Sequence, residues 1–200
     1  MTSWELFFSL LMFAVIGTIT PGGANLLAAA SGAQFGFQRS VPLLMGIVIG
    51  LASLVAAAAA GLAVLLQSAP TLQIAMKAIG SAYLLWLAWK IGRSGPPNIK
   101  SDSSATPTRF VAGLFLLWLN PKGWTMALGA AAAYAGLATT PIRLALLMGA
   151  VFGVAALLAL SLWCTGGLML ARALRTERQW RTVNATLGLF LAASIIPMWL

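Results

Sequence analysis

Two short polar interruptions, one in each half of the chain, hold the residues whose types could bind a small anion. They read Thr20-Pro21-Gly22-Gly23 and Asn120-Pro121-Lys122-Gly123. In each, a good helix N-cap residue precedes a proline, which is the arrangement that opens a new helix. The N–H groups of a helix start lack intrahelical partners and carry partial positive charge, so two such starts could together bind a substrate carboxylate. Ordinary proline kinks are the alternative.

Lys122 is the one charged residue well inside an apolar segment, and we expect it to face a cavity. A charge at mid-depth in a bilayer costs about 2.5–3.5 kcal/mol on insertion scales, so a lipid-facing position is disfavoured. In a cavity, Lys122 would pair with a substrate carboxylate or exchange a proton. Alternatively, it snorkels along its half-helix toward water. The predicted substrate-binding residues are Thr20, Pro21, Gly22, Gly23, Asn25, Asn120, Pro121, Lys122 and Trp124.

Chemistry other than binding has little support in the sequence. Cys164 is the single cysteine and histidine is absent, so we expect no metal site, no cofactor and no catalytic residues. The three acidic residues, Glu5, Asp102 and Glu177, lie at segment ends or in connections, so no buried carboxylate proton relay is expected. The sequence therefore predicts that the protein is not an enzyme.

The composition of the chain is that of a membrane protein. Of its 200 residues 60% are hydrophobic and 8% are charged, whereas about a quarter of a soluble domain is charged. Six apolar segments can each form a membrane-crossing helix of about 20 residues: 4–19 with a continuation to 33, 41–66, 72–91, 110–137, 144–170 and 183–200. We predict an all-α integral membrane protein with a single domain over residues 1–200. Helices 1 and 4 would be broken near the middle of the bilayer.

Basic residues gather in alternate connections between these segments. The first, third and fifth connections and their borders hold nine of them: Arg39, Lys90, Arg93, Lys100, Arg109, Arg172, Arg175, Arg178 and Arg181. The second and fourth connections hold Lys77 and Arg143. The positive-inside rule therefore places the odd connections, including a polar linker at 93–108, in the cytoplasm and both termini outside. This orientation accounts for the net charge of +9 without a nucleic-acid partner. Alternatively, residues 172–181 form an amphipathic helix on anionic lipid, with the same orientation.

The two halves of the chain also resemble each other. Pro21 is followed by Leu43-Leu44-Met45-Gly46 and Gly50, and Pro121 by Leu146-Leu147-Met148-Gly149 and Gly153. Halves of three helices each, about 1–92 and 109–200, would enter the membrane from opposite sides, which is the inverted repeat typical of transporters. Chance similarity between two apolar helices is the alternative. The spacing of Gly46, Gly50, Gly149 and Gly153 lets helices approach closely, either within one chain or between the subunits of a homodimer.

Several short motifs together point to one family. They are Thr20-Pro21-Gly22-Gly23-Ala24-Asn25, Gly36-Phe37, Gly46-Ile47-Val48-Ile49-Gly50, Gly80-Ser81-Ala82-Tyr83-Leu84 and Asn120-Pro121-Lys122. In these the sequence resembles the lysine-exporter family, also called the LysE/RhtB amino-acid exporters, small proteins of the bacterial inner membrane. The resemblance covers nearly the whole chain. With the predicted orientation, it implies that both termini are periplasmic.

The resemblance implies efflux of amino acids or their derivatives, such as basic amino acids, homoserine or threonine, driven by the proton-motive force. Two positions depart from the family pattern: Gly23 stands where proline is usual, and Leu51 where many members carry an acidic residue. Without that carboxylate, a neutral amino acid or a related small metabolite is the favoured substrate. The alternative is a structural or assembly subunit of the membrane that transports nothing.

Overall fold

The computed structural model describes residues 3–62, 70–96, 110–196 and 199. Every regular element within these ranges is helical, which confirms the predicted all-α class. The ends of the predicted segments 41–66 and 183–200, and most of the predicted linker 93–108, lie outside the described residues. The elements are α1 (Ser3–Ile19), α2 (Gly23–Ala57), a π-helical turn η1 (Ala58–Leu62), α4 (Pro70–Gly92), α5 (Phe110–Trp118), α6 (Pro121–Ala133), a 3-10 turn η2 (Ala135–Leu137), α7 (Pro141–Ala173) and α8 (Glu177–Ala193).

Three helical stretches in the described part of the chain are long and apolar enough to cross a bilayer. They are Gly23–Leu62, Ile74–Gly92 and Pro141–Ala173. The helix Ser3–Ile19 is also apolar but shorter. These helices support a multi-pass membrane protein, and the arrangement of six crossings stays a prediction.

The α2 helix bends sharply at Gly36, whose backbone has φ 76° and ψ 172°. The hydroxyls of Ser31 and Ser40 on either side of the bend are 2.7 Å apart, although nine residues of straight helix would separate them by about 13 Å. A positive φ is readily adopted only by glycine, which lets one residue replace a loop. We call residues 23–35 the first limb of α2 and residues 37–57 the second limb. The expected connection around Arg39 is therefore this single glycine, and Arg39 itself is helical.

The second limb of α2 packs between α5 and α7 through small residues. Gly46 and Gly50 lie against the backbone of α5, and Gly149 and Gly153 of α7 lie against Ala52 of the second limb. A glycine at such a contact lets two helix backbones approach closely, because no side chain separates them. The neighbours of all four glycines belong to the same chain, and a homodimer stays a prediction.

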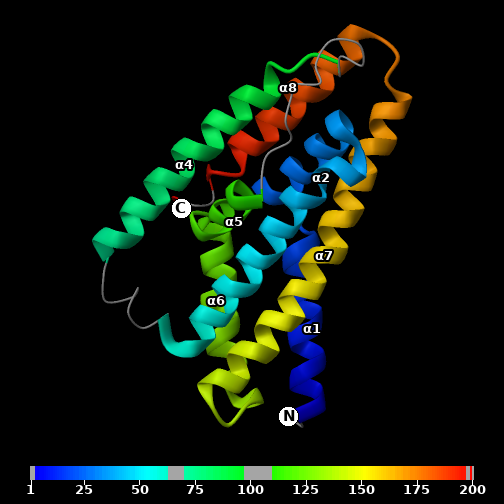
Figure 1. Cartoon of the computed structure of the whole chain (residues 1–200). Coiled ribbons are helices and arrows are strands. Elements are labelled where there is room, and N and C mark those ends of the chain that lie inside the picture. Colours follow the sequence, from blue (N-terminus) through cyan, green and yellow to red (C-terminus); the bar gives the residue numbers. More distant parts are fainter. Residues whose placement is uncertain (1–2, 63–69, 97–109, 197–198, 200) are drawn as a thin grey trace.

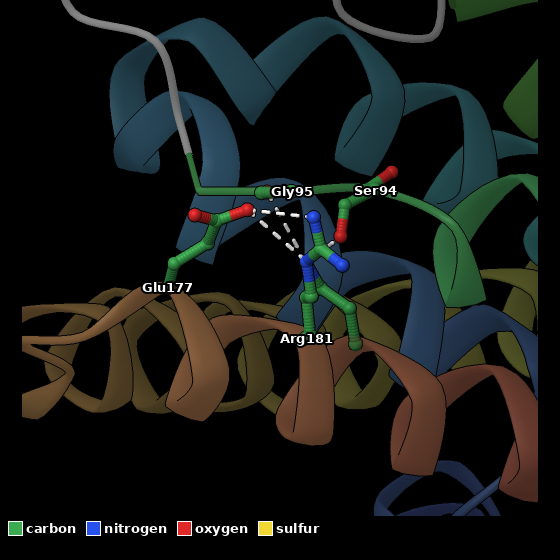
Figure 2. A network of polar contacts seen from close by, with 5 residues as sticks. Ser94, Gly95, Glu177 and Arg181 are labelled. Carbon is green, nitrogen blue, oxygen red and sulfur yellow. Dashed lines mark hydrogen bonds and ion pairs between the residues drawn. The ribbon is translucent and has the colours of Figure 1, made fainter.

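Helices α4 and α8 form an antiparallel pair beside this core (Figure 1). Gly188 of α8 lies against the backbone of Gly92 at the end of α4. Beyond the end of α4, the Asn184 amide donates to the Ser94 carbonyl oxygen at 2.8 Å. Figure 2 shows Ser94 and Gly95 beside the ion pair in which Arg181 contacts the Glu177 carboxylate at 2.7 Å. The Asn184 amide thus fastens the first residues after α4 to the middle of α8.

The described parts of the predicted basic connections share one end of the molecule. In Figure 1 the bend of α2, the end of α4 and the turn between α7 and α8 lie at the same end, away from the N-terminus. The stretch 172–181 is not a separate amphipathic helix. Arg172 lies in the last turn of α7, and Thr176 caps a new helix, with its hydroxyl and the Gln179 side chain each bonded to the other residue's backbone N–H. Such a capping box starts a helix at this position, so Arg175 lies in a short turn between Arg172 of α7 and the two arginines of α8, Arg178 and Arg181.

Candidate functional site

Both predicted interruptions separate helices in the structure. Helix α5 ends at Trp118 and α6 begins at Pro121. Asn120 caps α6, since its side-chain oxygen accepts a hydrogen bond from the Lys122 backbone N–H at 3.0 Å. Proline at the first helical position costs no hydrogen bond, because that N–H has no partner in a helix start. This local chemistry sets the start of α6.

The first interruption is longer than the N-cap pattern predicts. Helix α1 ends at Ile19 and α2 begins at Gly23, preceded by an extended Gly22 with φ −164° and ψ 177°. Thr20 does not cap α2, because Pro21 and Gly22 separate it from the helix start. Its hydroxyl instead donates back to the Ile16 carbonyl oxygen of α1 at 2.5 Å.

The Thr18 and Thr20 carbonyl groups at the end of α1 accept hydrogen bonds from side chains of two other helices. The Asn25 amide of α2 donates to the Thr18 and Thr20 carbonyl oxygens at 2.8 and 2.9 Å. The Lys122 ammonium of α6 also donates to the Thr20 oxygen, at 2.9 Å. The final carbonyls of a helix have no intrahelical partner, and inside a bilayer each needs one. The two interruptions therefore meet at the Thr20 carbonyl.

A small cavity of about 50 Å³ lies between the interruptions. Its lining residues are Gly17, Thr18, Gly22, Gly23, Ala24, Asn25, Ile47, Leu51, Leu117, Asn120, Lys122, Gly123, Met126, Ala156 and Leu160. Lys122 is the charged residue of this lining, and none of the described residues contributes a carboxylate to it. A cavity that accepts benzene has a volume of ~150 Å³. The cavity in this conformation is therefore too small to hold an amino acid.

Most of the predicted substrate-binding residues come together at this cavity. Five of them line it: Gly22, Gly23, Asn25, Asn120 and Lys122. Thr20 contributes its carbonyl oxygen to the contact with Lys122. Pro121 is the first residue of α6, between Asn120 and Lys122. Trp124 does not line the cavity. Its indole N–H donates to the Trp118 carbonyl oxygen at 2.7 Å, so it satisfies the end of α5.

The sequence did not single out most of the apolar wall of the cavity. Ile47 and Leu51 of the second limb and Ala156 of α7 form part of this wall. Met126 lies over Gly17, where an added Cβ would collide with the methionine sulfur. Of these residues, Ile47 stood in a family motif and Leu51 was noted as a departure from the family pattern. Buried apolar residues on long apolar helices look alike in sequence, so tertiary packing alone reveals them.

Trp163 of α7 is a further residue that sequence reasoning missed. Its indole N–H donates to the Ile19 carbonyl oxygen at 3.1 Å. Together with Asn25 and Lys122, it provides donors for the last three carbonyls of the α1 end, those of residues 18–20. No feature of the sequence near residue 163 indicates this contact, because its partner is 144 positions away.

The chain matches the model of the LysE type translocator family over residues 15–193. The protein belongs to this family. It is therefore a member of a transporter family and not an enzyme, as the sequence predicts. The motifs that suggested the family include both interruptions, which this structure brings to one cavity.

Several curated bacterial proteins resemble part of this LysE type translocator. It is 38% identical over 114 residues to a cysteine/O-acetylserine efflux protein of Klebsiella pneumoniae subsp. pneumoniae, which is 56% of each chain. Proteins of the same name from Escherichia coli and Salmonella typhimurium are 34% and 32% identical over 113 and 111 residues, 55% of each chain. These matches span about half the length of this chain and of the relatives. No solved structure matches the chain.

Proposed function

We propose that this protein is a secondary transporter that exports a small neutral amino acid or a closely related metabolite across the bacterial inner membrane. The proton-motive force would drive it, as in the lysine-exporter family it resembles. Cysteine and O-acetylserine, which the names of its relatives give, are the first candidate substrates. The observation that carries the proposal is the cavity between the interruptions, whose lining has one lysine, two helix starts and an apolar wall.

The cavity offers complementary groups to a zwitterion. The Lys122 ammonium group and the N–H groups at the start of α2 would bind the carboxylate. The Thr18 and Thr20 carbonyls at the negative end of α1 would accept hydrogen bonds from the ammonium group. Leu51 and Ala156 would contact the substrate side chain. A cationic side chain would find no carboxylate partner among the described lining residues, which favours a neutral one.

The proposal includes the predicted topology. Residues 1–200 would form one domain of six crossings, with inverted halves 1–92 and 109–200, a cytoplasmic linker at 93–108 and periplasmic termini. Two antiparallel pairings support it, because they join elements at the same position of each half. The second limb of α2 pairs with α7, and α4 pairs with α8. The common location of the basic connections also supports it (Figure 1).

Uptake into inverted membrane vesicles tests this function. Labelled cysteine, O-acetylserine, threonine and lysine would be offered with and without a proton gradient. We expect gradient-dependent uptake of the neutral substrates and not of lysine. Lys122→Met should abolish uptake, while Lys90→Met, on the exposed last turn of α4, should not. Absence of uptake for every compound would favour the alternative of a structural or assembly subunit.

A further inference from the structure

One hydrogen-bonded oxygen joins the two halves of the chain at the cavity. The Thr20 carbonyl oxygen accepts hydrogen bonds from Lys122 and from Asn25, each at 2.9 Å. Thr20 and Asn25 belong to the first half, whereas Lys122 lies 102 positions further on. A carbonyl oxygen has two lone pairs, so both are occupied. Lys122 therefore has a neutral backbone partner in this narrow form of the cavity.

We propose that the contact between Lys122 and the Thr20 carbonyl is a lock that holds the empty protein in this narrow form, here called the closed state, and that a carboxylate widens the cavity to an open state by taking over the ammonium group. This inference rests on the proposed function only for the identity of the carboxylate, which would be that of the substrate. The lock itself is a property of the chain.

The exchange of partners is favourable for Lys122. A hydrogen bond between two ionised groups is stronger than one to a neutral carbonyl. The Thr20 oxygen keeps its hydrogen bond from Asn25 after Lys122 leaves, so opening does not leave this carbonyl without a partner. The contact can therefore break without the cost of an orphaned backbone group.

Gly22 provides the space through which Lys122 reaches across the interruption. A Cβ at this position would lie 3.2 Å from the lysine nitrogen and 3.3 Å from its Cδ. Those separations are shorter than ordinary van der Waals contact. An alanine at position 22 would therefore force the end of the lysine side chain to shift by a few tenths of an ångström. This shift would strain the contact with Thr20 without removing the charge, so the variant tests the lock separately from the charge.

The small volume of the closed cavity explains why a substrate would favour the open state. At about 50 Å³ it has no room for an amino acid, so the carboxylate can engage Lys122 fully only when α6 moves away from the end of α1. A ligand shifts a conformational equilibrium only through a difference in its affinity for the two states. The lock supplies that difference, because Lys122 is committed to Thr20 in the closed state and free in the open state.

Access to the cavity wall measures the open fraction. Ala156, which is buried in this wall, would be replaced by cysteine in a Cys164→Ala background, which removes the single native thiol. The rate of modification by N-ethylmaleimide, which is larger than the closed cavity, would be followed by mass spectrometry on purified protein. We expect slow modification in this Ala156→Cys, Cys164→Ala protein, which we call the parent. In Lys122→Met and in Gly22→Ala the rate should rise at least about tenfold. A hydrogen bond to an ionised group contributes a factor of about this size to an equilibrium constant. Lys90→Met is the control and should match the parent.

The carboxylate step is tested with a small carboxylate on the parent protein, which carries Ala156→Cys and Cys164→Ala. Acetate should accelerate modification, whereas equal concentrations of acetamide, which has the same shape without the charge, should not. Equal effects of the two compounds would overturn the carboxylate step. A parent-like modification rate in Lys122→Met would overturn the lock, whatever the rate in Gly22→Ala.

The outcomes separate the lock from the proposed function. If Lys122→Met abolishes vesicle uptake but leaves modification slow, Lys122 binds substrate and the lock is wrong. If both variants accelerate modification but the vesicles take up none of the amino acids, the lock stands and the proposed export function fails.

Discussion

The close packing of the first limb of α2 on α7 gives a sharp test of the arrangement that positions the cavity. Gly167 and Gly166 are neighbours inside α7 with opposite surroundings. A Cβ added to Gly167 would run into the Ala29 backbone carbonyl, whereas a Cβ added to Gly166 would meet nothing within 4 Å. Gly167→Ala and Gly166→Ala are therefore a matched pair of substitutions that differ only in this contact.

The expected difference between the two variants follows from two terms. Alanine is more favourable than glycine in a helix interior by about 0.8–1 kcal/mol, and this gain applies to both positions. Overpacking costs typically ~1–3 kcal/mol, and the upper part of that range applies at Gly167 because the neighbour is backbone and cannot rotate away. The free energies of unfolding should therefore differ by about 2–3 kcal/mol. For a chain of this size that is roughly 4–12 °C in melting temperature.

The assay is thermal unfolding of both purified variants in the same detergent, followed by tryptophan fluorescence. We expect Gly166→Ala to melt at or above the temperature of the unmodified protein and Gly167→Ala to melt well below it. If the two variants melt at the same temperature, the first limb of α2 does not approach α7 backbone to backbone. The placement of the first interruption against α7 would then be wrong.

Three further outcomes are expected. Met126→Ala should widen the cavity, so that leucine becomes a competitor of the labelled substrate in vesicle uptake; failure of leucine to compete would contradict the assignment of Met126 to the cavity wall. Asn25→Ala should lower stability by ~1–3 kcal/mol in the melting assay, because it removes the amide donor of two carbonyls at the end of α1; an unchanged melting temperature would count against this role. In cysteine-free protein, Arg143→Cys should react with an impermeant thiol reagent in intact cells and Arg175→Cys only after permeabilisation, and the reverse pattern would invert the topology.

Local chemistry made the two interruptions predictable from sequence. Proline lacks an N–H and asparagine is a good N-cap, so Asn120 followed by Pro121 starts a helix in almost any surroundings. The structure begins α6 at Pro121. The same reasoning located the first interruption but not its length, because Pro21 and the extended Gly22 both precede the first residue of α2. The prediction that Thr20 caps α2 was therefore wrong, although the predicted end of α1 was correct.

The bend at Gly36 lies within the predicted connection between residues 33 and 41, and Gly36 also belongs to one of the family motifs. What the sequence did not predict is the form of this connection, which is a single glycine inside an otherwise helical stretch. Of the 20 glycines in the chain, only Gly36 and Gly61 have a positive φ within the described ranges. The bend occurs at Gly36 because the two limbs pack on each other and on α7. This packing joins residues that are far apart in sequence. Periodicity within a window of residues carries no record of such contacts.

The two interruptions are equivalent in position but complementary in chemistry, and this difference makes the site. One reads Pro21-Gly22-Gly23 and the other Pro121-Lys122-Gly123. A lysine at both positions would bring two cations together in a low-dielectric interior, and a glycine at both would leave a carboxylate without a cation. With Gly22 opposite Lys122, one half supplies the space and the other the charge. A Gly22→Lys, Lys122→Gly double exchange should therefore restore part of the uptake that Lys122→Gly alone loses, because the charge returns to the same cavity from the opposite half.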